Sequence, residues 1–320
     1  MSLSIEQFAE AFERIKKQIS HTVVGQEDLV NGVLVGLLAR GHLLLEGAPG
    51  LGKTLVARTL AAVSGCAFKR IQFTPDLMPS DVTGSSVFDR QTSSFTFVPG
   101  PIFAQLLLAD EINRAPAKTQ SALLEAMQDR QVTVDGTSRP LPQPFVVVAT
   151  QNPVESQGTY PLPEAQLDRF LVKLTVLDPP RDVEQAIVRN HAEGFDPSDL
   201  SRIQPVTTPA ELTAMQNLAQ TVRADDSIIS YIVDLARKTR DDRAIELGAS
   251  PRASIALLKA AQVIAASEGR SFVTPDDVKP MAKPVLRHRV MLHPDAQLQG
   301  TTPDDRIEDI LRRLPVPRAA

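Results

Sequence analysis

Short, largely apolar runs that read as strands alternate with helix-like segments along the first half of the chain. The runs lie at 42–45, 67–73, 106–109, 145–150 and 171–176. Apolar residues recur with helical spacing at 4–18, 55–62 and 117–128. Ser4 and Gln7 have the spacing of a capping box at the start of the first of these helices. Strands that are apolar on both faces are typical of a parallel sheet covered by helices on each side. The pattern therefore predicts an α/β fold with a five-stranded parallel sheet.

The second half of the chain is almost entirely helical in its spacing of apolar residues. The expected helices lie at 182–192, 209–221, 227–240, 251–267, 275–285 and 306–314. The sequence Asp178-Pro179-Pro180 is a stiff break directly before the first of them. We therefore expect two domains, an α/β core over residues 1–178 and an all-α domain over residues 179–320.

Two segments of the first domain alternate apolar and polar residues in the manner of β-hairpins. The first covers 85–98, where a polar tip at 89–94 separates the two arms. The second begins at 131–136 and returns through a segment with prolines at 140, 142 and 144. Ordinary surface loops are the plainest interpretation of both segments.

Composition narrows the classes of protein that fit this pattern. The chain has 38 acidic and 34 basic residues, for a net charge of −4, which argues against a general nucleic-acid binder. No apolar run approaches the roughly 18 residues that span a bilayer, and the charged, amphipathic N-terminus does not resemble a signal peptide. The single cysteine, Cys66, is expected in the core and excludes an intrachain disulfide. The 5 histidines lack the spacing of metal ligands. These features predict a cytoplasmic protein.

The residues between the apolar run at 42–45 and the helix at 55–62 form a glycine-rich phosphate-loop motif. They are Gly47, Ala48, Pro49, Gly50, Leu51, Gly52, Lys53 and Thr54. Glycines let the backbone fold so that its N–H groups surround an anion, and the helix N-terminus adds partial positive charge. We expect Lys53 to reach the β- and γ-phosphates and the Thr54 hydroxyl to hold Mg²⁺. The alternative is a strand–helix turn that binds nothing.

Polar residues follow two later strands of the predicted sheet. Asp110 and Glu111 end the run at 106–109, and Asn152 follows the run at 145–150. Ligands gather at the carboxyl ends of parallel strands, so Asp110 is expected to orient Mg²⁺ through its waters. Glu111 is expected to polarise the water that attacks the γ-phosphate, and Asn152 to hold that water. Taken alone, the acidic pair is also compatible with a helix cap, and Asn152 with a turn.

With these motifs the chain resembles an AAA+ ATPase, and more narrowly the MoxR family. The AAA+ resemblance is carried by the phosphate loop and by residues 24–26, 106–114 and 149–153. The MoxR resemblance is carried by residues 162–170 and 247–253. Together the motifs cover the chain from about residue 23 to about residue 290. The resemblance implies an AAA+ core with a five-stranded sheet, a helical lid, and ATP with Mg²⁺ bound between them.

The resemblance also implies roles for residues that the pattern alone does not single out. Val24 and Leu55 join the expected nucleotide-binding residues. Arg169 matches the arginine finger, which enters the site of the neighbouring subunit in a hexameric ring. Arg252 matches the second sensor, and the sequence leaves open whether it serves its own site or a neighbour's. Arg114 is a weaker candidate for a subunit contact. For Arg169 and Arg252 the alternative is a surface salt bridge.

Three functions are compatible with this family. The favoured one is a chaperone-like ATPase that remodels or matures a protein client, commonly together with a von Willebrand factor A domain protein. The second is the ATPase subunit of a magnesium-chelatase-like enzyme. The third, a nucleic-acid motor, is disfavoured by the acidic composition. The two hairpins match inserts that the resemblance places in helix 2 and before the first sensor. Phe95 and Phe97 of the first hairpin are expected to contact a client or line a pore.

Overall fold

A five-stranded parallel sheet lies at the centre of the first domain, as the apolar runs predicted. The structure is a computed structural model that describes residues 3–91, 93–153, 158–197, 199–201 and 203–317. The strands lie in the order β2-β5-β8-β1-β9. Their bounds are β1 (Leu43–Glu46), β2 (Phe68–Gln72), β5 (Leu106–Asp110), β8 (Val146–Gln151) and β9 (Val172–Thr175). Because every pairing is parallel, the carboxyl ends of all five strands meet at one edge.

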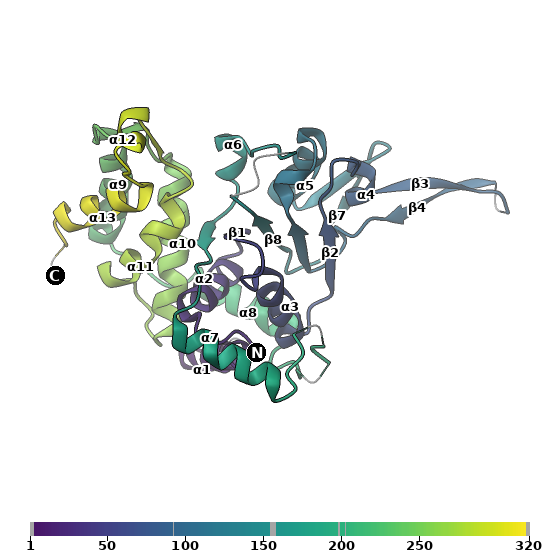
Figure 1. Ribbon diagram of the computed structural model, residues 1–320, viewed down its shortest axis with the longest axis horizontal. Helices are drawn as coiled ribbons and strands as arrows, with labels where there is room; N and C mark the ends of the chain where they lie inside the picture. The colour runs from purple at the N-terminus through teal and green to yellow at the C-terminus, as the bar shows by residue number, and fades with distance from the viewer. Residues whose placement is uncertain (1–2, 92, 154–157, 198, 202, 318–320) are drawn as a thin grey trace.

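Helices cover both faces of the sheet, which explains why its inner strands β5, β8 and β1 are apolar over most of their length (Figure 1). Leu43 and Leu45 of β1 pack into the cluster formed with α1 (Ile5–Ser20), α2 (Glu27–Leu38) and α3 (Lys53–Ser64). Leu44, which points to the other face, packs with Leu123 of α5 (Ala117–Asp129). The predicted capping box begins α1, where the Ser4 hydroxyl accepts from the Gln7 N–H.

Both predicted hairpins are present. The first consists of β3 (Gly84–Asp89) and β4 (Ser94–Pro99), follows α4 (Pro79–Thr83) and projects far from the sheet (Figure 1). Thr92, in its predicted tip, lies outside the described residues. The second consists of β6 (Gln131–Val134) and β7 (Thr137–Pro140). The hairpins meet where the Arg139 guanidinium lies 4.0 Å from the centre of the Phe97 ring.

The predicted helices of the second half are all present. They are α7 (Arg181–Ala192), α8 (Pro209–Ala219), α9 (Asp226–Asp241), α10 (Pro251–Ser267), α11 (Pro275–Leu286) and α13 (Pro303–Arg313), with a short α12 (Pro294–Leu298) between the last two. A two-stranded ribbon, β10 (Ile245–Leu247) with β11 (Met291–Leu292), was not predicted because its arms are too short to show a pattern. None of the helices in the described residues is both long and apolar enough to cross a membrane.

The second half packs closely on the first. Arg14 of α1 pairs with Glu211 of α8 at 2.8 Å, and the Gln216 side chain donates to the Leu37 carbonyl at the end of α2. One hydrophobic cluster runs from α1 and α2 into α8, α10 and α11. The division after residue 178 stays a prediction, and this shared core spans it.

Candidate active site

The phosphate-loop motif forms the connection between β1 and α3. Gly50 and Gly52 have φ values of +85° and +83°, a conformation that favours glycine. Gly47 has no room for a side chain, because a Cβ there would lie 2.5 Å from the Val176 carbonyl oxygen. Lys53 Nζ donates to the carbonyl oxygens of Gly47 and Ala48 at 2.5 and 2.7 Å. The loop thus places an ammonium group beside the N-terminus of α3, an arrangement that fits a polyphosphate.

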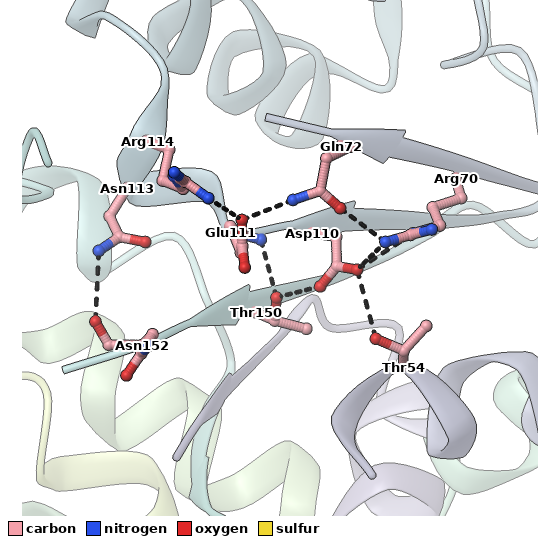
Figure 2. A network of polar contacts seen from close by, with 9 residues as sticks. All are labelled: Thr54, Arg70, Gln72, Asp110, Glu111, Asn113, Arg114, Thr150 and Asn152. Atoms are coloured by element: carbon pink, nitrogen blue, oxygen red, sulfur yellow. Dashed lines mark hydrogen bonds and ion pairs between the residues drawn. The ribbon is translucent and has the colours of Figure 1, made fainter. Parts of the chain in front are cut away.

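Thr54 and Asp110 bring hard oxygen donors together beside this loop (Figure 2). Thr54 Oγ1 lies 3.3 Å from Asp110 Oδ2, and Asp110 is buried at the carboxyl end of β5. The Thr150 hydroxyl donates to the other carboxylate oxygen of Asp110 at 2.5 Å. A hydroxyl and a carboxylate are ligand types that Mg²⁺ prefers. The donor set therefore fits the predicted metal.

Arg70 is a site residue that sequence reasoning missed. From β2 its Nε and Nη2 atoms donate to Asp110 Oδ2 at 3.1 and 2.8 Å, so a guanidinium balances the charge of the buried carboxylate (Figure 2). β2 is an edge strand, and Arg70 lies on it two residues before Gln72. Exposed polar residues on an otherwise apolar strand are the only local signal that could have drawn attention to it.

Glu111 is held in place from three directions. Its backbone is left-handed, with φ 56°, and its N–H donates to the Thr150 hydroxyl at 2.8 Å. The carboxylate accepts from Gln72 Nε2 at 2.6 Å and from Arg114 Nη1 at 2.9 Å. Thr150 thus ties Glu111 and Asp110 to the neighbouring strand β8 (Figure 2). Arg114, the weaker candidate for a subunit contact, pairs here with Glu111 of its own chain.

Asn152 lies at the same edge of the sheet as Glu111. It is buried just beyond the end of β8, and its carbonyl accepts from Asn113 Nδ2 at 3.4 Å (Figure 2). Val24 is half-buried, and the adjacent Gly25 packs so tightly against Val183 of α7 that no side chain fits there. Leu55 is half-buried in the first turn of α3. The nucleotide contacts of Val24 and Leu55 stay predictions.

The two predicted arginines lie at the opposite edge of the sheet from the phosphate loop. Arg169 follows α6 (Glu164–Leu167) and precedes β9, which runs parallel to β1, whereas the loop follows β1. Arg252, in the first turn of α10, lies beside it, with Nη1 3.5 Å from Asp168 Oδ2. The structure therefore brings Arg169 and Arg252 together, and not to the phosphate loop of their own chain.

The edge that carries these arginines is strongly basic. A cavity of about 240 Å³ is lined by six basic side chains and by Asp168 as its acidic one. The basic residues are Arg40, Arg130, Arg169, Arg252, Lys259 and Arg289. Partial burial lowers the pKa of Arg130, and the nearby charge of Arg40 lowers it further. Such a surface is suited to an anion supplied from outside this chain.

Comparisons with known proteins agree with the geometry. Residues 42–172 match the model of the ATPase family associated with various cellular activities (AAA), and residues 237–310 match the AAA lid domain. The uncharacterized protein YeaC of Bacillus subtilis is 49% identical over 94% of this chain and 93% of its own length. Chaperone MoxR1 of Mycobacterium tuberculosis is 42% identical over 96% of this chain and 82% of its own.

The fold is also that of a solved relative. A crystal structure from Cytophaga hutchinsonii, named as a "putative ATPase", superposes with a TM-score of 0.89 at 38% identity and covers 98% of this chain and 97% of its own. The matches extend over the sheet, the helical lid and the motifs at both edges of the sheet. The chain therefore belongs to the MoxR family of AAA+ ATPases.

Proposed function

We propose that this protein hydrolyses ATP with Mg²⁺ at sites shared between subunits, and that it uses the energy to remodel or mature a protein client. One observation carries the proposal. Lys53, Thr54, Asp110 and Glu111 gather at one edge of the sheet, and Arg169 with Arg252 gathers at the other. A chain that carries both halves at opposite edges can complete its sites by assembling head to tail into a ring.

At the phosphate-loop edge, each residue has one task. The loop N–H groups and Lys53 bind the triphosphate, and Thr54 with Asp110 holds Mg²⁺. When bound, Mg²⁺ neutralises charge on the phosphate oxygens. Glu111 accepts the proton of the attacking water, and Asn152 orients that water.

At the opposite edge, Arg169 and Arg252 serve the site of the neighbouring subunit. Their separation from their own phosphate loop supports a role in trans for both, including Arg252, for which the sequence left the choice open. The basic cavity around them supplies the positive charge that a developing phosphoryl transition state requires. We propose a hexameric ring, as the family resemblance implies.

The family favours a protein client. A relative with 42% identity carries the name Chaperone MoxR1, and the exposed rings of the first hairpin offer a contact surface. We propose that the protein works in the cytoplasm, together with a von Willebrand factor A domain protein. The alternative is the ATPase subunit of a magnesium-chelatase-like enzyme, so ATP-dependent insertion of Mg²⁺ into a porphyrin would contradict the protein-client proposal.

Replacing Glu111 by Gln tests the chemistry. E111Q keeps the shape of the side chain and removes the base, so hydrolysis should fall by roughly 10²-fold or more with ATP affinity nearly unchanged. The matched control is E125Q, the same change on an exposed residue of α5, which should leave the rate unchanged. If E111Q retains more than about a tenth of the wild-type rate, Glu111 is not the base. E111Q, which binds ATP without hydrolysing it, is also the variant with which to capture the client from a lysate. K53A, which should not bind ATP, is the control and should not retain the client.

A further inference from the structure

Strand β9 runs from the side of the sheet where its strands begin, beside Arg169, to the side where they end, beside the phosphate loop. At its carboxyl end the Val176 N–H donates to the Glu46 carbonyl at 2.7 Å, directly beside the phosphate loop. At its other end Arg169 precedes it by three positions. β9 is also an edge strand, paired only with β1 within the described sheet. Whatever positions β9 from its free side therefore positions Arg169.

Arg289, just beyond the end of α11, contacts the backbone on both sides of Arg169. Its Nε donates to Asp168 Oδ1 at 2.7 Å, and its Nη2 donates to the carbonyls of Asp168 and Phe170 at 3.1 and 2.6 Å. Its Nη1 donates to the Leu171 carbonyl at 3.0 Å. The Arg289 side chain is only 4% exposed. These bonds fix the residue before the finger and the two residues after it.

The residues before Arg289 extend this contact along β9. His288, which is buried, donates from Nε2 to the Phe170 carbonyl at 3.1 Å. Arg287 Nη1 donates to the Thr175 hydroxyl at 2.6 Å, at the far end of the strand. Three consecutive lid residues, 287–289, thus contact the chain at points from Asp168, just before the finger, to Thr175, the last residue of β9. The lid and the finger segment are joined by a continuous polar contact.

The strength of the individual pairs singles out Arg289. The Arg252–Asp168 pair is 3.5 Å long, and its arginine side chain is 60% exposed, so solvent screens it. The Arg289–Asp168 pair is buried and short, and charge-assisted bonds of this kind are the strong ones. Removing Arg289 would leave the half-buried Asp168 carboxylate and three carbonyls without these donors, and the segment around Arg169 would have to rearrange.

We propose that Arg289 is the positioning residue for the Arg169 finger, and that it makes the finger move with the lid of its own subunit. The position of one subunit's lid is thereby transmitted to the active site of the next subunit. This inference rests on the proposed function, in which Arg169 acts in trans. A positioning role for Arg289 can be distinguished from a merely structural contact between lid and core. In a positioning role, loss of Arg289 should impair the neighbour's site and leave the subunit's own site intact.

The test uses full-length R289Q, with R289K as a milder variant that keeps the charge and fewer of the bonds. A misplacement of about 1 Å costs up to 10²-fold in rate, so kcat of R289Q should fall by about 10²-fold, and R289K should lie between R289Q and wild type. ATP affinity should stay within about twofold of wild type, since the subunit's own phosphate loop is unaltered. R306Q is the control, because Arg306 pairs with Asp242 inside the lid at 2.6 Å and does not contact the finger segment.

Mixed rings separate the inference from the proposed function. E111Q subunits keep a correctly placed Arg169, and R289Q subunits keep an intact Glu111. Mixing the two should therefore restore hydrolysis, as mixing E111Q with R169A should. Mixing R289Q with R169A should restore nothing. If E111Q rescues R169A and neither R289Q nor R289K, the positioning role is wrong while the shared site stands. If E111Q rescues none of the three, the shared site itself is wrong. An unchanged kcat in folded R289Q would also overturn the inference.

Discussion

Acid should destabilise this fold through His42, which is buried where β1 begins. His42 Nε2 lies 3.0 Å from the Met127 carbonyl, and the Val147 N–H donates to Nδ1 at 3.0 Å. These two contacts require a neutral ring with its proton on Nε2. Burial lowers the pKa of His42 to about 4, from 6.5. Protonation at Nδ1 would leave the Val147 N–H facing another N–H at the join between α5, β1 and β8.

The magnitude follows from the two pKa values. The unfolded chain binds the proton near pH 6.5 and the folded chain only near pH 4, so between these values unfolding takes up a proton. The contribution of neutral His42 is therefore complete above pH 6.5 and is lost as the pH falls toward 4. At about 1.4 kcal/mol per pH unit, the loss between pH 7 and pH 4.5 is roughly 2 kcal/mol.

Urea unfolding of wild type and H42Q at pH 7, 5.5 and 4.5 measures this loss directly. Glutamine stays neutral at every pH, so H42Q should be less stable than wild type at pH 7 and should lose about 2 kcal/mol less on going to pH 4.5. H191Q, the same change at an exposed histidine, should retain the wild-type slope. Parallel pH profiles for wild type and H42Q would refute the assignment of acid sensitivity to His42.

Two further predictions concern binding. K53A should lose the rise in melting temperature that Mg-ATP gives wild type, because a ligand stabilises only the protein that binds it; an undiminished rise would place the nucleotide elsewhere. F95S, on the first hairpin, should leave the melting temperature and basal hydrolysis unchanged, because this ring is 73% exposed. F95S should nevertheless reduce client capture by the E111Q ring. Unchanged capture would mean that Phe95 does not contact the client and that the hairpin is an ordinary surface loop.

Elements with a local signature could be predicted from the sequence. The five strands, the two hairpins and the helices of the second half all follow from apolar periodicity, because each buries a face that its own sequence encodes. The phosphate loop was predictable because the glycines and Lys53 that form it are neighbours in the chain. The positions of Asp110 and Asn152 at one side of the sheet were predictable because the carboxyl ends of parallel strands meet there.

The polar contacts that set the positions of these residues could not be predicted. Arg70 and Asp110 are 40 residues apart, and Arg289 and Asp168 are 121 apart, so no spacing rule connects them. The sequence shows an arginine at each position, and an arginine is most often a solvated surface residue. Only the folded chain shows that Arg289 is buried against Asp168. The β10–β11 ribbon was missed for a related reason, because its pairing joins two short segments 44 positions apart, Ile245–Leu247 and Met291–Leu292.

The most direct test of a site shared between subunits is hydrolysis by mixtures of R169A and E111Q. Removal of such an arginine costs about 10³ to 10⁵ in rate, so each variant alone should be nearly inactive. In mixed rings some junctions combine an intact Glu111 with an intact Arg169, and activity should reappear and depend on protein concentration as the rings assemble. If the mixture stays inactive while light scattering shows mixed oligomers, Arg169 does not act on its neighbour's site.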